Sequence, residues 1–149
     1  MSIGDICNRD VVYVNRDVTV HAAARLMRHY HVGSLVVVDE IDGKRVPAGM
    51  VTDRDLVVEI YAMDLDPKVL TVGDIMFPAL VTAPESLGVP AALALMRAKG
   101  VRRMPLTDSD NQLSGIVTID DVLVVLAEAL TDISRTVARE PARDTPQRQ

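Results

Sequence analysis

The sequence predicts an α+β fold in which two β-α-β-β-α repeats pack sheet to sheet as a pseudo-twofold pair. The 149-residue chain matches itself at an offset of 69, so that Gly-Asp-Ile at 4–6 recurs at 73–75 and Leu-Met-Arg at 26–28 recurs at 95–97. Apolar residues make up 48% of the chain but aromatic residues only 3%, which requires an aliphatic core and excludes both a disordered chain and a disulfide scaffold. A repeat of about 60 residues is marginally stable alone, so the two sheets should bury each other.

The register of the repeat changes once, in a polar stretch at residues 39–47. After a gap of three residues the offset is 66, and four further positions match: Gly49, Val51, Thr52 and Asp55 fall on Gly115, Val117, Thr118 and Asp121. A turn absorbs such an insertion at little cost in free energy, so we expect a turn in this stretch.

Each repeat begins with a short turn, Ser2-Ile-Gly-Asp5 or Thr71-Val-Gly-Asp74. A hydroxyl followed three residues later by a carboxylate can cap the first amides of a helix. An extended segment is expected next, at residues 11–14 and 80–82. A helix follows it in both copies, with Pro90 tolerated in the first turn, because apolar residues recur at helical spacing: Val20, Ala23, Ala24, Met27 and Tyr30, and then Val89, Ala92, Leu93 and Met96.

The central strand of the first repeat is predicted at residues 35–38, Leu-Val-Val-Val. This run is too short and too β-branched for a helix, so we expect a strand that is buried on both faces. A second strand at residues 49–51 pairs with it, and a final helix starts at Thr52 in the first copy and at Thr118 in the second. Residues 64–68, which include Pro67, are typical of a linker.

Charge and cysteine content restrict the function classes. The 16 Lys and Arg against 21 Asp and Glu give a formal net charge of −5, which together with few aromatic rings argues against a nucleic-acid surface. The single cysteine, Cys7, has no disulfide or metal partner, as expected in a reducing cytoplasm. No targeting motif and no apolar run of roughly 20 residues are present. We therefore expect a cytoplasmic protein with no membrane partner.

A short motif follows the predicted helix and strand in both copies. It reads Gly-Met-Val-Thr-Asp-Arg-Asp at 49–55 and Gly-Ile-Val-Thr-Ile-Asp-Asp at 115–121. Together with Thr-Val-x-x-Ala-x-x-x-Met at residues 19–27, these copies resemble the CBS domain, named for cystathionine β-synthase. The resemblance implies one domain over residues 2–62 and another over 71–130, joined by a linker at 63–70. We expect the tail, residues 131–149, to be disordered from about residue 136.

The resemblance also implies two symmetry-related clefts that bind adenosine-containing ligands, in a module that is often dimeric. In this family the Asp that ends the motif usually holds the ribose hydroxyls, and the Ser or Thr three residues earlier lies close to ribose or phosphate. The pair that opens the central strand often points at phosphate, and it is Gly33-Ser34 in the first copy. The nucleotide-binding candidates are Thr52, Arg54, Asp55, Arg102, Arg103, Thr118 and Asp121.

The chemistry of these residue types suits a nucleotide. A carboxylate accepts two hydrogen bonds from a vicinal diol, and guanidinium groups such as those of Arg102 and Arg103 donate in a fork to phosphate oxygens. The amides and the positive dipole end of the helix at Thr118 favour an anion. We expect the base to lie between the sheets against apolar groups such as Val12, Met104 and Pro105.

Each candidate also has a simpler interpretation. Thr-x-x-Asp at a helix start is a capping box, although a capping Thr does not prevent the Asp from facing a cleft. Arg102 and Arg103 are adjacent, so they point to opposite faces and only one reaches a given cleft. Because the first repeat has Gly33 and Ser34 there, the clefts should differ in phosphate affinity. Arg54 can turn toward phosphate or pair with a neighbouring aspartate, and Asp120 takes its place in the second copy.

Catalytic and metal-binding patterns are not found in the sequence. The histidines His21, His29 and His31 have no further ligand at the required spacing, and residues 39–45 match a calcium loop only in part. No Ser-His-Asp order, P-loop or Gly-x-Gly-x-x-Gly occurs. We expect no catalytic residue, no metal, no catalytic cofactor and no enzymatic activity.

The sequence thus favours a regulatory module that senses an adenine nucleotide (AMP, ADP or ATP) and transmits its occupancy to an unidentified effector protein or to its own homodimer. One alternative is a protein-interaction or dimerisation module with vestigial clefts. Others are a pair that binds NAD or S-adenosylmethionine, and a DNA-linked regulator that uses the arginines of the tail, Arg135, Arg139 and Arg143.

Overall fold

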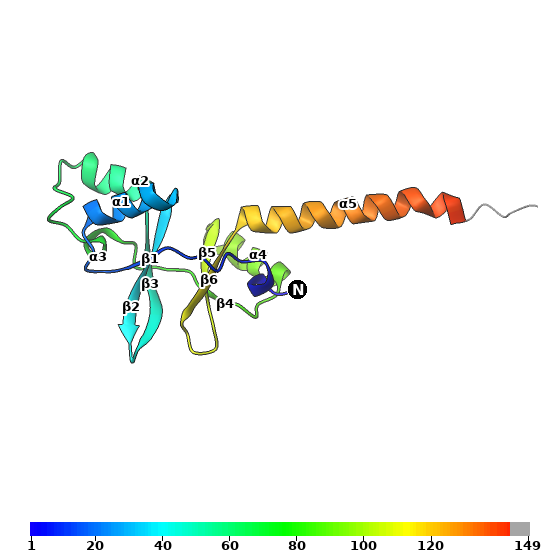
Figure 1. Ribbon diagram of the computed structural model, residues 1–149, viewed down its shortest axis with the longest axis horizontal. Coiled ribbons are helices and arrows are strands. Elements are labelled where there is room, and N and C mark those ends of the chain that lie inside the picture. The colour runs from blue at the N-terminus through cyan, green and yellow to red at the C-terminus, as the bar shows by residue number, and fades with distance from the viewer. Residues whose placement is uncertain (144–149) are drawn as a thin grey trace, which may run out of the picture.

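A computed structural model of the chain describes residues 1–143 and contains two three-stranded sheets with helices beside them (Figure 1). The first repeat consists of β1 (Tyr13–Asn15), α1 (Val20–Tyr30), β2 (Ser34–Ile41), β3 (Lys44–Thr52) and α2 (Asp53–Asp55), which continues into the π-helical segment η2 (Leu56–Tyr61). The second consists of β4 (Ala83–Pro84), α4 (Val89–Lys99), β5 (Arg103–Thr107), β6 (Leu113–Thr118) and α5 (Ile119–Arg143). The β-α-β-β-α order predicted for each repeat is confirmed.

The two sheets have the same topology. In each, the first strand pairs in parallel with the second, and the second pairs antiparallel with the third. Both antiparallel pairs carry an irregularity at the same repeat position, after Val37 and after Leu106. Residues 35–38 are at most 1% exposed, which confirms the prediction of a strand buried on both faces.

The opening turns cross from one repeat to the other. The short helix η1 (Ile3–Asp5) inserts the fully buried Ile3 into the core of the second repeat, and α3 (Val72–Ile75) inserts the fully buried Val72 into the core of the first. Equivalent backbone hydrogen bonds fix the two crossings, from Ile3 N to Leu87 O and from Val72 N to Val18 O, both at 2.8 Å. Each repeat therefore lacks part of its core without the other, which explains why the two fold as a pair.

Two equivalent glycines allow the crossing segments to approach the sheets. A Cβ atom on Gly115 would lie 2.6 Å from Cys7 Sγ and 3.1 Å from the carbonyl oxygen of Asn8. A Cβ atom on Gly49 would lie 2.6 Å from Met76 Sδ. Both distances to sulfur are shorter than van der Waals contact. Each crossing segment can therefore pack directly on the last strand of the other repeat only because these two positions lack a side chain.

The final helices of the two repeats differ in length. The segment formed by α2 and η2 ends at Tyr61, whereas α5 continues to Arg143 and extends away from the body (Figure 1). The helix thus passes residue 136, from which disorder was expected, and residues 144–149 lie outside the described residues. Residues 119–140 contain neither Gly nor Pro and many strong helix formers, which accounts for the continuation. Within residues 1–143, no helix, α5 included, is long and apolar enough to cross a membrane.

Candidate functional site

A cleft of about 220 Å³ lies where the two repeats meet. The first repeat contributes the segment before β1 and the start of β2, and the second contributes the start of β5 and the end of β6. Its lining residues are Asn8, Asp10, Val11, Val12, Val32, Gly33, Ser34, Val36, Arg103, Ile116 and Thr118. The walls therefore combine aliphatic side chains with hydroxyl, amide, carboxylate and guanidinium groups, a mixture typical of small-molecule sites.

Backbone hydrogen bonds hold the walls of the cleft in place. Asn8 and Ile116 exchange two N–H to O bonds of 2.9 Å, which attach the N-terminal segment to β6. The Asp53 amide donates to Gly33 O at 3.0 Å, and at the equivalent place the Ile119 amide donates to Arg102 O at 2.9 Å. The entry of each central strand is thus fixed to the start of the helical segment of its own repeat.

Thr118 and Asp121 form a capping box at the start of α5. Asp121 Oδ2 accepts hydrogen bonds from the Thr118 amide at 2.8 Å and from the Thr118 hydroxyl at 3.0 Å, and the Asp121 amide donates to Thr118 Oγ1 at 3.3 Å. Thr52 and Asp55 also form a capping box, and so do the opening turns at Ser2 and at Thr71. The capping interpretation is therefore confirmed at all four sites, and Asp121 Oδ1 accepts no hydrogen bond within residues 1–143.

The seven predicted site residues do not converge on one place. Arg103 and Thr118 line the cleft, whereas Thr52, Arg54, Asp55, Arg102 and Asp121 do not. Arg102 and Arg103 are both exposed, and only one of them reaches the cleft, as their opposite directions on a strand predict. Val12 lines the cleft as expected for a group beside the base, but Met104 and Pro105 are buried within the second repeat and do not.

Several lining residues were not identified from the sequence. Asn8, Asp10 and Val11 belong to the irregular segment between η1 and β1, and Ile116 belongs to β6. No motif marks the segment, and the repeat alignment does not help because the second copy has Phe77 and Ala79 where the first has Asn8 and Asp10. The one available signal was position, because the chain must cross between the repeats here.

A wider hollow of about 590 Å³ adjoins the cleft. It shares Asp10, Val11 and Val12 with the cleft and extends to Tyr13, Leu26 and Tyr30 at the surface of the first repeat. The cleft alone is smaller than the roughly 300–1,000 Å³ usual for a small-molecule site. A ligand the size of a nucleotide would therefore extend beyond it.

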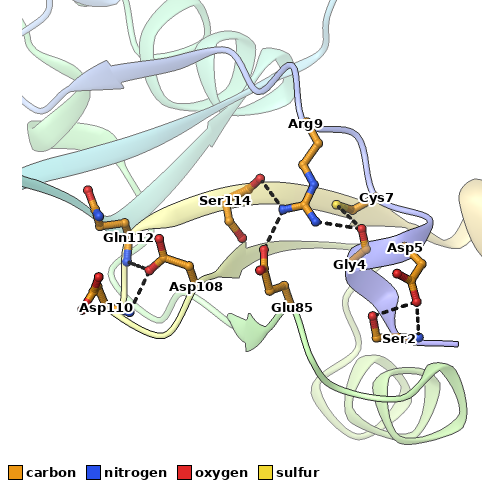
Figure 2. A network of polar contacts seen from close by, with 10 residues as sticks. All are labelled: Ser2, Gly4, Asp5, Cys7, Arg9, Glu85, Asp108, Asp110, Gln112 and Ser114. Carbon is orange, nitrogen blue, oxygen red and sulfur yellow. Dashed lines mark hydrogen bonds and ion pairs between the residues drawn. The ribbon is translucent and has the colours of Figure 1, made fainter.

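Arg9 anchors the N-terminal wall of the cleft to the second repeat (Figure 2). Arg9 Nη1 donates to Glu85 Oε2 at 2.6 Å and to the Ser114 carbonyl at 3.1 Å, while Nη2 donates to the Gly4 carbonyl at 2.9 Å. The hydrogen bond from Arg9 lowers the pKa of the Glu85 carboxyl below its usual value. Burial raises the pKa of the neighbouring Cys7 thiol, so this side chain behaves as an apolar packing group.

The first repeat has an ion pair at the position that corresponds to Glu85, but there the basic residue occupies this position. The pair joins β2 to the turn after β1. Arg16 takes the repeat position of Glu85, and its guanidinium donates to Asp39 Oδ1 at 2.8 Å and to Oδ2 at 2.7 Å. These hydrogen bonds lower the pKa of the Asp39 carboxyl. Both ion pairs are partly exposed, so they position local segments and add little to global stability.

Metal-ligating side chains do not gather in the described part of the chain. No group of three or more His, Cys, Asp or Glu side chains there is arranged to hold a metal ion. A separate hollow on the surface is lined by Arg25, Arg28, His29 and His31. That the protein takes no metal stays a prediction.

Comparison with known proteins is consistent with the repeat. A model of the CBS domain matches residues 3–62 and 72–128. Over 125 residues the chain is 37% identical to an uncharacterised protein of Methanopyrus kandleri, a match that covers 84% of this chain and 62% of that protein. It is 34% identical over 124 residues to hypoxic response protein 1 of Mycobacterium tuberculosis, covering 83% and 84% of the two chains.

Solved structures share the fold. A crystal structure of hypoxic response protein I with two coordinated zinc ions has a TM-score of 0.71 at 32% identity, covering 83% of this chain and 97% of that one. A CBS domain pair solved in complex with methylthioadenosine and S-adenosylmethionine has a TM-score of 0.70 at 23% identity, covering 85% and 99%. At that identity the second likeness concerns the fold alone.

Proposed function

The chain belongs to the CBS domain family, as a tandem pair, and we propose that it is a regulatory module that binds an adenine nucleotide (AMP, ADP or ATP) in the cleft between its repeats. Occupancy of the cleft is then transmitted to an effector protein or to the protein's own dimer. The observation that carries the proposal is the cleft itself, in which Gly33 and Ser34 of one repeat and Arg103 and Thr118 of the other line a single space beside aliphatic side chains.

The phosphate end of the ligand is assigned to the second repeat. Arg103 is the one guanidinium in the lining of the cleft, and Thr118 lies there at the start of α5. The positive end of the helix dipole and the fork of guanidinium donors both favour an anion in this position. The equivalent of Arg103 is Ser34, so the proposal places stronger phosphate binding at the Arg103 side.

The ribose and the base are assigned to the remaining walls. Asp121 uses Oδ2 for capping and has Oδ1 left to accept from a ribose hydroxyl, once the ligand brings that hydroxyl to the start of α5. The base lies against Val12 and Val36, where its flat apolar faces replace water. The hollow next to the cleft takes whatever part of the ligand the 220 Å³ space does not enclose.

Signalling follows from the position of the cleft between the repeats. A ligand that contacts both repeats at once binds differently to any two arrangements of them, and that difference in affinity is what shifts their populations. The hydroxyl of Thr118, which lines the cleft, donates to the Asp121 carboxylate as part of the capping box, and the proposed role of the cleft is binding without turnover.

The proposal is tested by calorimetry with AMP, ADP, ATP, NAD and S-adenosylmethionine on the wild type and two neighbouring variants. Arg103→Ala removes the guanidinium of the cleft, and Arg102→Ala removes a neighbouring exposed guanidinium outside it. We expect Arg103→Ala to weaken the binding of AMP by more than about tenfold, because hydrogen bonds to charged groups contribute about 1.5–3 kcal/mol. Arg102→Ala should leave the affinity for AMP unchanged. Adenosine, without phosphate, should bind both variants alike.

Absence of binding would favour the alternative function. A ligand at 100 times its Kd adds about 2.7 kcal/mol to the free energy of unfolding, which a thermal melt detects easily. If none of the five ligands raises the melting temperature at millimolar concentration, the clefts are vestigial and the chain is an interaction module.

A further inference from the structure

The C-terminal half of α1 and the residue that ends it carry a hollow of about 510 Å³ that is separate from the cleft between the repeats. The hollow is lined by Arg25, Arg28, His29 and His31, so every side chain in its lining is a guanidinium or an imidazole. It shares no residue with the cleft, and no carboxylate belongs to its lining. We call these four residues the basic cluster.

The basic cluster has no counter-ion within the part of the chain that the structure describes. The ion pairs found there use Arg9, Arg16 and Lys44 as their basic members, and none uses a residue of the cluster. Acidic side chains are not scarce, because the chain has 21 Asp and Glu against 16 Lys and Arg. All four residues of the cluster are exposed. Their donor groups are therefore open to an anion from solution.

Stabilisation of the helix end does not account for the whole cluster. Basic side chains in the last turn of a helix interact favourably with the negative end of its dipole, and Arg28 and His29 are placed in this way. The equivalent helix α4 has Arg97 and Lys99 in its last turn. Arg25 lies before the last turn of α1, where the effect of the dipole has fallen off.

The second repeat lacks the cluster. At three of its four positions the second repeat has a residue without a polar side chain: Ala94, Ala98 and Gly100 in place of Arg25, His29 and His31. His31 ends α1 in the left-handed backbone region with a φ of 54°, and Gly100 ends α4 in the same region with a φ of 65°. Glycine adopts this conformation more readily than any other residue. The first repeat therefore has an imidazole where backbone energy alone favours glycine, and such a conflict is typical of a functional position.

The donor groups of the cluster suit two linked phosphates. Arg25 and Arg28 are three residues apart on one helix and so are neighbours on its surface, and each guanidinium donates in a fork to phosphate oxygens. Each imidazole has at least one further N–H donor. The ring of His29 lies edge-on to the ring of Tyr30, with 4.8 Å between the centroids, which restricts its orientation. Four donor side chains around one hollow exceed what a single phosphate group occupies, and they match a pyrophosphate.

We propose that the basic cluster is an anion site that binds the linked phosphates of pyrophosphate or of a molecule that carries a pyrophosphate group. The site does not depend on the nucleotide proposed for the cleft, because the two places have no residue in common. It differs from the cleft in a second respect. The cleft takes its walls from both repeats, whereas the basic cluster belongs to the first repeat alone.

The first experiment measures the binding of pyrophosphate to the full chain by calorimetry. The variant Arg25→Ala/Arg28→Ala removes two guanidinium groups from the cluster, and its matched control Arg97→Ala/Lys99→Ala removes the same charge from the last turn of α4. We expect the Kd to rise at least about tenfold in the cluster variant and less than about twofold in the control. An equal rise in the two variants, or no binding to the wild type at about 5 mM, would overturn the proposal.

A third variant distinguishes the cluster from the cleft. Arg103→Ala removes the guanidinium of the cleft and should leave the affinity for pyrophosphate unchanged. If Arg103→Ala abolishes this binding and Arg25→Ala/Arg28→Ala does not, pyrophosphate binds in the cleft and the basic cluster is not a site. Failure of the nucleotide proposal, in contrast, would appear as a loss of AMP binding to the wild type with pyrophosphate binding intact.

A fourth variant separates binding from stability. His31→Gly should raise the Kd for pyrophosphate at least about threefold, while its melting temperature should be no lower than that of the wild type, because glycine suits the left-handed conformation. An unchanged Kd in this variant would contradict a role of His31 in the site.

The source of the phosphates is tested in the Arg103→Ala background. Tighter binding of pyrophosphate than of ADP supports a free anion as the ligand, and tighter binding of ADP supports a nucleotide held by its two phosphates. AMP, with one phosphate, should bind the cluster more weakly than either of them. Hexaglutamate is the competing probe, and tighter binding of this peptide than of pyrophosphate would assign the cluster to an acidic protein segment and overturn the proposal.

Discussion

Ser34 and Arg103 occupy equivalent positions in the two repeats and line the same cleft. One offers a small hydroxyl and the other a guanidinium, so the pseudo-twofold symmetry of the backbone is broken where a ligand would bind. The repeat thus accounts for the fold, while the difference between Ser34 and Arg103 contributes an electrostatic difference between the two sides of the cleft.

The first prediction separates capping from ligand binding. Asp121→Ala and Asp55→Ala each remove the carboxylate of a capping box, so both should lower the free energy of unfolding by about 0.5–2 kcal/mol. Asp121→Ala should also weaken nucleotide binding in the cleft, whereas Asp55→Ala should leave the affinity of that cleft unchanged. Denaturant melts and calorimetry on the same samples give both values.

The result that contradicts this assignment is equal affinity in the two variants. If Asp121→Ala binds AMP as tightly as Asp55→Ala does, the carboxylate has a structural role alone. Asp10, the carboxylate that itself lines the cleft, would then be the next candidate for the ribose contact.

The second prediction concerns the two glycines under the crossing segments. Gly115→Ala should destabilise the protein by about 1–3 kcal/mol, because the new methyl group meets both Cys7 Sγ and the backbone oxygen of Asn8. Gly49→Ala should cost less, since the group it meets is the flexible side chain of Met76. Urea denaturation of the two variants measures the loss in the free energy of unfolding. A larger loss for Gly49→Ala than for Gly115→Ala would contradict the contacts described for these two glycines.

The third prediction tests the exchange of opening turns. Ile3→Ala removes a fully buried side chain from the core of the second repeat, so it should lower the free energy of unfolding by about 2–5 kcal/mol although it lies next to the N-terminus. Val69→Ala, at an exposed position just before the equivalent turn, is the control and should change stability by less than about 0.5 kcal/mol. If the two variants melt at comparable temperatures, Ile3 does not contribute to the core of the second repeat.

The fourth prediction concerns acid. Asp39 and Glu85 have folded-state pKa values below their ordinary ones because of hydrogen bonds from Arg16 and Arg9. The stabilisation they give is therefore fully present above their unfolded pKa values, about 3.9 and 4.3, and is lost as the pH falls through the lowered folded values. Unfolding free energies measured between pH 3 and 7 should decline at the acidic end less steeply in Asp39→Asn/Glu85→Gln than in the wild type.

An unchanged slope in that double variant would show that other carboxylates control the acid response. Asp5 is the nearest alternative, because hydrogen bonds from the Ser2 amide and hydroxyl lower its pKa as well. Asp5→Asn alone distinguishes the two cases.

The elements of the fold could be predicted because each depends on a local pattern that occurs twice. The buried run at residues 35–38, the helices at Val20 and Val89 and the four capping boxes all follow from spacing alone. The length of α5 was not predicted, because the arginines and Pro141 suggested a tail, whereas residues 119–140, which contain neither Gly nor Pro, continue the helix. Only the structure shows that this helix extends away from the body (Figure 1).

The candidate site was predicted less completely, for a physical reason. Arg103 and Thr118 could be identified because they belong to the repeated motif and its strand entry. Asn8, Asp10 and Val11 could not, because the crossing of the N-terminal segment onto the other repeat is a long-range packing event without a local pattern. Arg102 does not reach this cleft because it points to the face opposite to that of Arg103.

The central claim is that the cleft at Arg103 and Thr118 binds a nucleotide, and a crystal structure grown with saturating AMP tests it most directly. The account predicts electron density between the repeats, with phosphate at Arg103 and the start of α5, ribose near Asp121 and the base against Val12. Density for AMP at any other place on the chain, or an empty cleft at a concentration that saturates binding in solution, would contradict it.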